Sequence, residues 1–277
     1  MDTRVRHRRC LVDGVDTFYR EAGRIDAPAI LLPHGYPCSS YEFRNLMPAL
    51  ADRWRLLAPD YPGAGYSATP ADFDYSFDGY AAFLDAFVRT IGLERFVLYL
   101  HDFGSPIGAR LAILAPHRVV AVIIQNGDIP YEDALGPKYA DLEKLWTLTP
   151  AAMRDRIGET ITQDEFQREF LNAVRPELAE RIPPDLWTLH WALVTPHRAA
   201  IAVRLIAGLK ENRAWFPQHR RYLSEHRPPA LTCGVRRTAT CRKRPRAPTC
   251  AICPTPSSTC STAATGCSKP TSRKWSR

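Results

Sequence analysis

The sequence predicts an α/β fold in which helices flank a mostly parallel sheet. Short apolar, β-prone runs alternate along the chain with segments whose apolar residues recur at helical spacing. Two of the runs, 29–32 and 96–100, are apolar without alternation, as in strands buried on both faces. A chain of 277 residues can bury one large core and still carry an inserted subdomain.

The elements follow one another in a regular order. Two short strands flank the turn signal Asp13-Gly14, and the second of them alternates with period two. The remaining expected elements are strand 29–32, helix 41–51, strand 54–58, helix 78–92, strand 96–100, helix 104–115, strand 119–125 and, after a helical insertion, helix 209–226 and a strand from about 230.

The stretch 96–115 organises the rest of the chain. A buried strand ends at Leu100 and a helix begins at Gly104, so His101, Asp102 and Phe103 must form a tight reversal. Such a turn lifts one side chain above the sheet and directs it at the helix N-terminus, where backbone N–H groups stabilise negative charge. The residue at the apex is Asp102, which predicts a carboxylate nucleophile.

Two further motifs end the strands upstream, and the three motifs resemble one family. They are His34-Gly35-Tyr36-Pro37 and the Pro-Gly turn Asp60–Ser67. With His101-Asp102-Phe103-Gly104 they resemble the α/β-hydrolase fold, in the Asp-nucleophile branch of epoxide hydrolases and haloalkane or haloacetate dehalogenases. Gly35 lets the backbone approach the active centre, and the N–H groups of Tyr36 and Phe103 are expected to form an oxyanion hole.

A carboxylate nucleophile narrows the substrate class. It attacks an sp³ carbon that bears a leaving group and forms an alkyl ester of Asp102, which water then hydrolyses. The expected partners are therefore a small apolar electrophile and water, with no cofactor and no metal. Ester hydrolysis needs a histidine base and an acid that orients it.

The motif residues favour an epoxide over a carbon–halogen bond. Dehalogenases of this branch typically hold the halide with a Trp and an Asn. Phe103 and Tyr36 stand at these two positions here, so the chain resembles the dehalogenases less at the halide site. Residues 130–207 fit a helical cap, in which Tyr131 and Tyr139 are candidate acids for the epoxide oxygen; packing of an amphipathic helix explains them equally well. A haloalkane or haloacetate dehalogenase is the alternative.

Other polar and aromatic residues receive lesser roles. Asp128 is a possible alternative acid, although a turn residue explains it better. His34 and Gly35 are expected at the binding site, and His101 is expected to be structural. Two aromatic residues at helical spacing in the insertion, Trp187 and Trp191, are candidate binding residues. With His190 between them, they are expected to line the cap or its core rather than to act in catalysis.

The segment 231–277 departs from the family pattern. It holds ten basic residues, no acid and six of the eight cysteines, whereas the first 230 residues carry a net charge of −2. We therefore divide the chain into a core 1–129, a cap 130–207, a return to the core 208–230 and an aberrant tail 231–277. The N-terminus lacks the apolar run of a signal peptide and no stretch is long enough to span a membrane, so a cytoplasmic protein is expected.

A frameshift near Leu231 explains the tail. Codons read across the residue junctions turn every Cys into Leu, Met or Val, and can restore the acid at Arg237/Thr238 and the Gly-His base at Ala264/Thr265. A zinc site is the weaker explanation, because Cys250-Ala251-Ile252-Cys253 lacks a second close pair. A basic nucleic-acid-binding arm is also disfavoured. Without the base, the fold could remain as a catalytically silent binding module for a small ligand.

Overall fold

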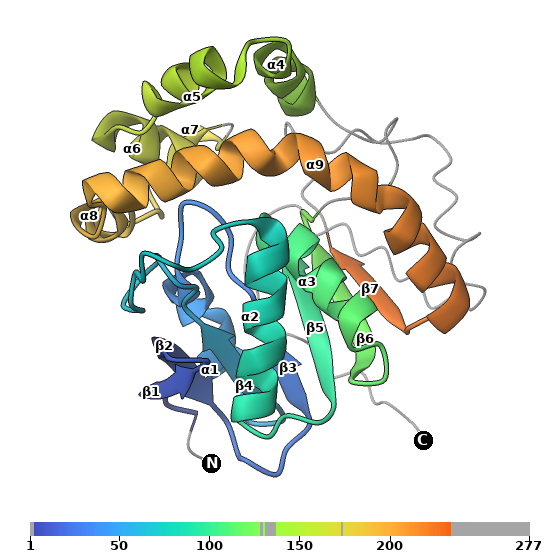
Figure 1. Cartoon of the computed structure of the whole chain (residues 1–277). Coiled ribbons are helices and arrows are strands. Elements are labelled where there is room, and N and C mark those ends of the chain that lie inside the picture. Colours follow the sequence, from blue (N-terminus) through green and yellow to red (C-terminus); the bar gives the residue numbers. More distant parts are fainter. Residues whose placement is uncertain (1–2, 128–129, 131–136, 173, 234–277) are drawn as a thin grey trace.

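The computed structural model describes residues 3–127, 130, 137–172 and 174–233, and these form one sheet covered by helices (Figure 1). The strands are β1 Arg6–Val12, β2 Val15–Ala22, β3 Ala29–Leu31, β4 Arg55–Pro59, β5 Phe96–His101, β6 Val119–Gln125 and β7 Ala230–Cys233. Their order is β1-β2-β4-β3-β5-β6-β7, antiparallel from β1 to β4 through β2 and parallel from β4 onward. The predicted mostly parallel sheet is confirmed.

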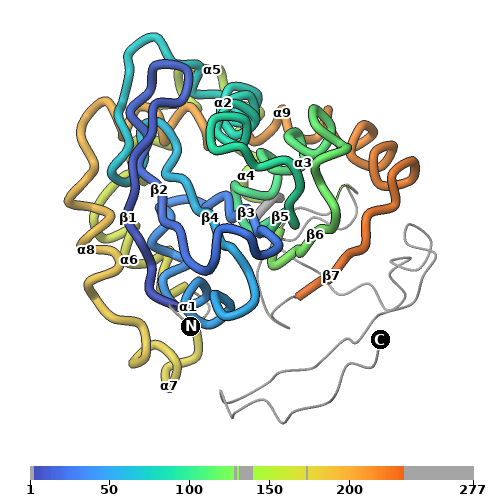
Figure 2. Tube along the Cα trace, turned by 90° about the horizontal axis from the view of Figure 1, so that it is seen from below, coloured from blue at the N-terminus to red at the C-terminus, as the bar shows by residue number. Residues whose placement is uncertain are grey.

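Helices cover both faces of the sheet, and a second group lies above its upper end (Figures 1 and 2). Helices α2 and α3 pack on one face and α1 on the other (Figure 2). The bounds are α1 Leu46–Leu50, α2 Phe77–Thr90, α3 Gly104–Leu114, α4 Pro137–Trp146, α5 Pro150–Gly158, α6 Gln163–Leu171, α7 Pro176–Ala179, α8 Asp185–Ala192 and α9 Pro196–His226.

The alternation of side chains along the central strands builds the two halves of the core. Leu31, Leu57 and Leu98 belong to the cluster that contains the buried residues of α2 and α3. The neighbouring residues Ile30 and Leu56 belong to a second cluster, which contains Met47 of α1. Successive residues of a strand point to opposite faces, so runs that are apolar throughout are buried on both sides.

Two expected helices differ from those in the structure. The segment expected as one helix over 41–51 is a 3₁₀ helix, Ser40–Arg44, followed by the short helix α1. Pro48 lacks the N–H that a continuous α-helix would donate to the Arg44 carbonyl, which accounts for the break. The last long helix, α9, begins at Pro196, earlier than the expected start at residue 209. It runs without interruption past the boundary between 207 and 208, which we assigned to the end of the cap.

One buried arginine fastens α9 to the core helices. Arg110 of α3 donates from Nε to Asp78 Oδ1 (2.6 Å), from Nη1 to the Pro106 carbonyl (3.0 Å) and from Nη2 to Asn212 Oδ1 (2.9 Å). Its guanidinium also lies 4.5 Å from the ring centroid of Trp215 in α9. Because α9 continues from the sheet to the upper helices, this contact positions those helices as well (Figure 1).

In the described part of the chain, β7 is the last strand in the sheet order, and all four of its residues are exposed. The tail residues 234–277, with the cysteines considered for a zinc site, lie outside the described residues. Within that part, no group of three or more His, Cys, Asp or Glu side chains could hold a metal ion. Also among the described residues, no single helix has the length and hydropathy of a membrane span, and only the pair α8 and α9, bent by 108°, passes on length and composition.

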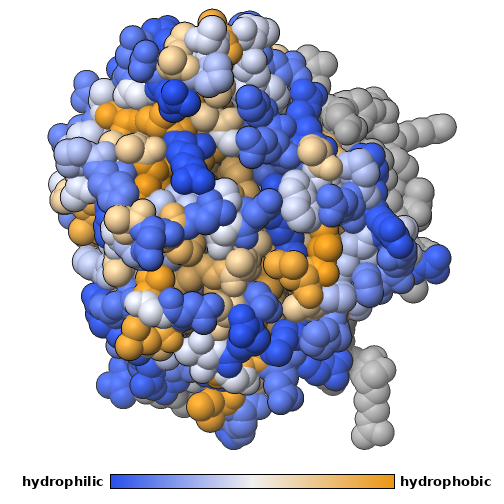
Figure 3. Space-filling model, viewed as in Figure 1, coloured by the Kyte–Doolittle hydropathy of each residue, from blue (hydrophilic) through white to orange (hydrophobic). Residues whose placement is uncertain are grey.

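The visible surface carries apolar side chains in several separate patches rather than one continuous area (Figure 3). Exposed large apolar residues include Leu114 at the end of α3 and Leu148 between α4 and α5. Scattered exposure of this kind is ordinary for a folded protein and does not by itself mark an interface.

We expect Arg110→Ala to lower the free energy of unfolding by about 3 kcal/mol, because it leaves the buried Asn212 carboxamide unpaired and removes three hydrogen bonds. Urea unfolding followed by circular dichroism measures the change. The control is Arg89→Ala, which breaks the Arg89–Asp85 pair on the surface of α2 and should cost at most about 0.5 kcal/mol. Equal losses in the two variants would contradict the role assigned to Arg110.

Candidate active site

The strand–turn–helix expected around Asp102 is present. Strand β5 ends at His101, α3 begins at Gly104, and Asp102 between them has φ +44°. A positive φ strains a residue with a side chain, and such residues concentrate at functional sites. A Cβ on Gly104 would lie 2.2 Å from the Pro33 carbonyl oxygen, so the turn is pressed against the loop that follows β3.

Two backbone N–H groups converge on one oxygen of the Asp102 carboxylate. Tyr36 N donates to Asp102 Oδ1 at 2.8 Å and Phe103 N donates to the same atom at 2.7 Å. The approach is close, since a Cβ on Gly35 would lie 2.6 Å from Asp102 Cβ. These two N–H groups are the ones that the sequence predicts for an oxyanion hole. In the part of the chain that the structure describes, no side chain donates to Asp102, which is exposed.

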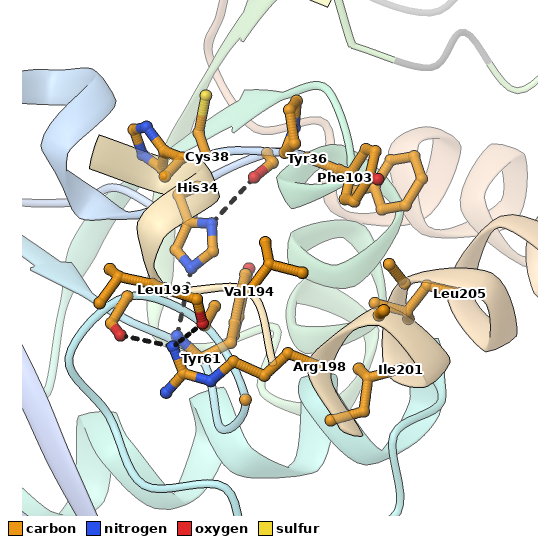
Figure 4. A pocket seen from close by; sticks show the side chains of 18 of the residues that line it. His34, Tyr36, Cys38, Tyr61, Phe103, Leu193, Val194, Arg198, Ile201 and Leu205 are labelled. Atoms are coloured by element: carbon orange, nitrogen blue, oxygen red, sulfur yellow. Dashed lines mark hydrogen bonds between the residues drawn. The ribbon is translucent and has the colours of Figure 1, made fainter. Parts of the chain in front are cut away.

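His34 holds the peptide that carries the Tyr36 N–H group (Figure 4). Its Nδ1–H donates to the Gly35 carbonyl (3.0 Å), which also accepts from Cys38 N (3.1 Å), and its Nε2 accepts from Tyr61 N (3.2 Å). Burial lowers the pKa of His34, so the ring is neutral. With both nitrogens bonded to the backbone, His34 orients the loop and cannot serve as a base.

An apolar cavity lies between this loop and the helices above it. Tyr36 and Phe103 line it from the core, with rings stacked at 5.5 Å, and apolar residues of α9 face them (Figure 4). The Tyr61 hydroxyl, which is buried, has no hydrogen-bond partner in the described structure. The other lining residues include Pro37, Cys38, Ile107, Ile161, Phe166, His190, Leu193, Val194, Arg198, Ile201, Ala202 and Leu205.

His190 joins α8 to the core beside this cavity. Its Nδ1–H donates to the Leu186 carbonyl (2.6 Å), and its Nε2 accepts from Ser39 N (3.1 Å) in the segment after the His34 loop. This arrangement requires a neutral imidazole, and burial lowers the pKa of His190 accordingly. The sequence placed His190 in the cap, but the contact with Ser39, 151 residues away, has no local signal.

Glu42, for which the sequence predicted no role, lies behind the loop. Its Oε2 accepts from Gly35 N at 3.1 Å, and its Oε1 is buried without a hydrogen-bond partner among the described residues. Burial, aided by the negative charge of Asp102, raises the pKa of Glu42 to about 8. An acidic residue on a short helix usually indicates a solvated surface, so its burial could not be foreseen.

The remaining predicted site residues do not gather at Asp102. Trp187 and Trp191 are absent from the cavity lining and pack against Phe170 and Phe166 of α6. His101 Nδ1 bonds the Gln125 carbonyl (2.7 Å), in keeping with a structural role. Two predictions, Asp128 and Tyr131, fall outside the described residues, as does the side chain of Tyr139.

The fold defines a class: proteins with a mostly parallel sheet flanked by helices, in which a tight turn joins a central parallel strand to a helix. The profile of the family described as alpha/beta hydrolase fold matches residues 28–192. The chain belongs to the α/β-hydrolase fold family. An uncharacterized hydrolase of Saccharomyces cerevisiae is 33% identical over 230 residues, which cover 81% of this chain and 78% of that protein.

Several related proteins with named activities are haloalkane dehalogenases. Haloalkane dehalogenase 2 of Mycobacterium tuberculosis is 32% identical over 173 residues, which span 62% of this chain and only 57% of that enzyme. The structure of an ancestral haloalkane dehalogenase aligns with a TM-score of 0.67 and 26% identity, covering 82% of this chain and 80% of the other. An epoxide hydrolase, CorEH, shares the fold, with a TM-score of 0.64, 20% identity and coverage of 84% and 90%.

We expect Gly35→Ala to lower the free energy of unfolding by about 2–3 kcal/mol, because the new methyl group has no room beside Asp102. Urea unfolding measures the loss. Gly158→Ala is the matched control, since a Cβ there meets nothing within 4 Å. It should leave stability unchanged or raise it slightly. If both variants are as stable as the parent chain, the close approach of the two loops is wrong.

We expect the contribution of His190 to stability to fall as the pH drops below 6.5, because burial lowers the pKa of His190 and the unfolded chain therefore takes up the proton first. Each histidine with a lowered pKa changes the free energy of unfolding by up to about 1.4 kcal/mol per pH unit. This holds between its pKa in the folded chain and its pKa in the unfolded chain. His34 and His219 contribute in the same direction. His190→Gln should flatten the slope of unfolding free energy against pH below pH 6.5. An unchanged slope would contradict the neutral His190–Ser39 contact.

Proposed function

We propose that this chain is an Asp-nucleophile hydrolase fold that displaces a leaving group from an sp³ carbon of a small apolar substrate. The observation that carries the proposal is the pair of backbone N–H groups, from Tyr36 and Phe103, that hold Asp102 Oδ1 at 2.8 and 2.7 Å. With one oxygen held, Oδ2 is left to attack. Asp102 is thus oriented as a nucleophile, which the resemblance of its turn to the Asp-nucleophile branch supports.

The same N–H groups suit both halves of the reaction. When Oδ2 forms a bond to carbon, the carbon–halogen bond breaks and the halide departs with the electron pair. Oδ1 then becomes the carbonyl oxygen of the ester and remains between Tyr36 N and Phe103 N. Attack of water on this ester would place negative charge on Oδ1, where the two donors stabilise it.

Carbon–halogen compounds are the first substrate class to test. Relatives that exceed 25% identity and have a named activity include haloalkane dehalogenases, whereas the likeness to an epoxide hydrolase, at 20% identity, concerns the fold alone. The apolar lining of the cavity suits an uncharged substrate body. This ordering reverses the preference drawn from Tyr36 and Phe103 in the sequence.

An epoxide is the second candidate, and one observation favours it. Neither Tyr36 nor Phe103 carries a side-chain N–H group, but the Tyr36 phenol lies close enough to Asp102 to feel its charge. Burial, with Glu169 and Asp102, raises the pKa of Tyr36, so the hydroxyl stays protonated. A neutral O–H donor at this position suits an oxygen leaving group that must be protonated as the ring opens.

The second half of the reaction lacks a recognisable base in the described residues. All eight histidines of the chain are among them, and none bonds the Asp102 carboxylate. His34 and His190, which line the cavity, have both ring nitrogens engaged. We therefore propose that the alkyl ester forms on Asp102 and is hydrolysed very slowly.

We expect 1-bromobutane to add one butyl group to the protein and release one equivalent of bromide, with little further turnover. Intact-mass spectrometry, peptide mapping and a halide assay measure adduct, position and stoichiometry. 1,2-Epoxybutane, run in parallel, should give a hydroxybutyl adduct without halide if the epoxide candidate holds.

The control variants are Asp102→Asn, which should abolish the adduct, and Asp85→Asn on the surface of α2, which should leave it unchanged. An adduct on other carboxylates only would refute Asp102 as the nucleophile. Saturable binding of either compound with no adduct would favour the catalytically silent binding module. Repeated turnover without a trapped ester would show that a base is present.

A further inference from the structure

Behind the loop that contacts Asp102 lies a second carboxyl group, that of Glu42, which the displacement chemistry does not use. Glu42 belongs to the 3₁₀ helix Ser40–Arg44, and its Oε2 accepts from Gly35 N at 3.1 Å. Its Oε1 is buried and has no hydrogen-bond partner in the described structure. A buried carboxyl oxygen without a partner is costly when charged, so it calls for an explanation.

Glu42 and Asp102 are connected through a single short segment. Glu42 holds the N–H of Gly35, and the next N–H along the chain, that of Tyr36, donates to Asp102 Oδ1. Gly35 is confined between them, since an added Cβ would lie within 3 Å of three Asp102 atoms. A change in the strength of the Glu42 contact therefore acts on the peptide that positions the Tyr36 donor.

The groups that face Glu42 are mostly acidic or neutral. Asp102 and the Cys38 thiol act on it directly, and the phenols of Tyr61 and Tyr99 sense its charge. In the described part of the chain Glu42 makes no ion pair. Burial and the Asp102 charge raise its pKa to about 8, and the Gly35 and Cys38 contacts oppose this. Glu42 is therefore mostly neutral at pH 7 and ionises just above it.

We propose that Glu42 is a positioning residue whose charge is coupled to that of Asp102, so that its ionisation speeds alkylation of Asp102 and slows hydrolysis of the ester. This inference rests on the proposed function for its kinetic part. Its electrostatic part, the coupling of two carboxyl groups through the Gly35–Tyr36 segment, stands on the contacts alone.

The two half-reactions change the charge at Asp102 in opposite directions. Alkylation converts the carboxylate into a neutral ester, so a negative charge on Glu42 favours it by relieving repulsion. Hydrolysis places a negative charge on Oδ1 again, so a neutral Glu42 favours that step. Because coupling is reciprocal, removing the charge of Asp102 must lower the pKa of Glu42.

The first test needs no substrate. In protein labelled with ¹³C at the glutamate carboxyl carbons, one resonance should titrate near pH 8 and disappear in Glu42→Gln. In Asp102→Asn that resonance should titrate about one pH unit lower, because the like charge is gone. A Glu42 resonance that titrates below pH 5, or one unaffected by Asp102→Asn, overturns the proposal.

The second test measures alkylation in a single turnover against pH. The rate of butyl adduct formation with 1-bromobutane should rise about three- to tenfold between pH 7 and 9 and stay flat in Glu42→Gln. The control is Glu225→Gln, which removes an exposed carboxylate paired with Arg221 and should keep the rise. Thermal melting of each variant shows that it is folded.

The outcomes separate the two proposals. A parent chain that forms no adduct refutes the proposed function, whereas the carboxyl titration still decides the coupling between Glu42 and Asp102. An adduct that forms with the same pH profile in Glu42→Gln and in the parent overturns the role of Glu42 and leaves the nucleophile intact.

Discussion

The structure depends on one close approach, in which the loops after two neighbouring strands meet at Asp102 Oδ1. Strands β3 and β5 pair in parallel, so both end at the same edge of the sheet. There Tyr36 N and Phe103 N reach the same oxygen. The contact requires a left-handed backbone at Asp102 and no side chain at Gly35. The sheet therefore maintains a strained backbone at Asp102 and a confined position at Gly35.

The helices above the sheet enclose an apolar cavity beside Tyr36 and Phe103. His190 of α8 binds the backbone of Ser39, so the helix above the cavity is fixed to the segment that continues from the Tyr36 loop. Arg110 fixes the other end of the same assembly through Asn212 of α9. Since the polar side chains at the cavity are mostly engaged with protein groups, apolar contact dominates what a ligand would meet.

Local sequence predicts the parts of this site that follow from backbone geometry. The strand ends, the turn at Asp102 and the N–H groups of Tyr36 and Phe103 are encoded within a few residues of each motif. Glu42 and His190 could not be assigned for two different reasons. Glu42 contacts Gly35, only seven residues away, but its burial depends on the folded surroundings. His190 contacts Ser39, 151 residues away, which no local pattern indicates. The continuity of α9 escaped prediction for a related reason: its composition changes along its length as its surroundings change from cap to core.

The described residues supply the nucleophile that we propose, Asp102, and its two N–H donors, and under that proposal these groups alone favour the first half of a hydrolase reaction. A carboxylate held by two N–H groups needs no base to attack carbon, whereas water needs one to attack the resulting ester. The frameshift hypothesis places both the missing base and its orienting acid beyond Leu231, in the segment whose composition departs from the rest of the chain. On that hypothesis, the frameshift leaves the groups for alkylation and the oxyanion hole in place but removes the base that ester hydrolysis needs. The reaction then stops at the ester on Asp102.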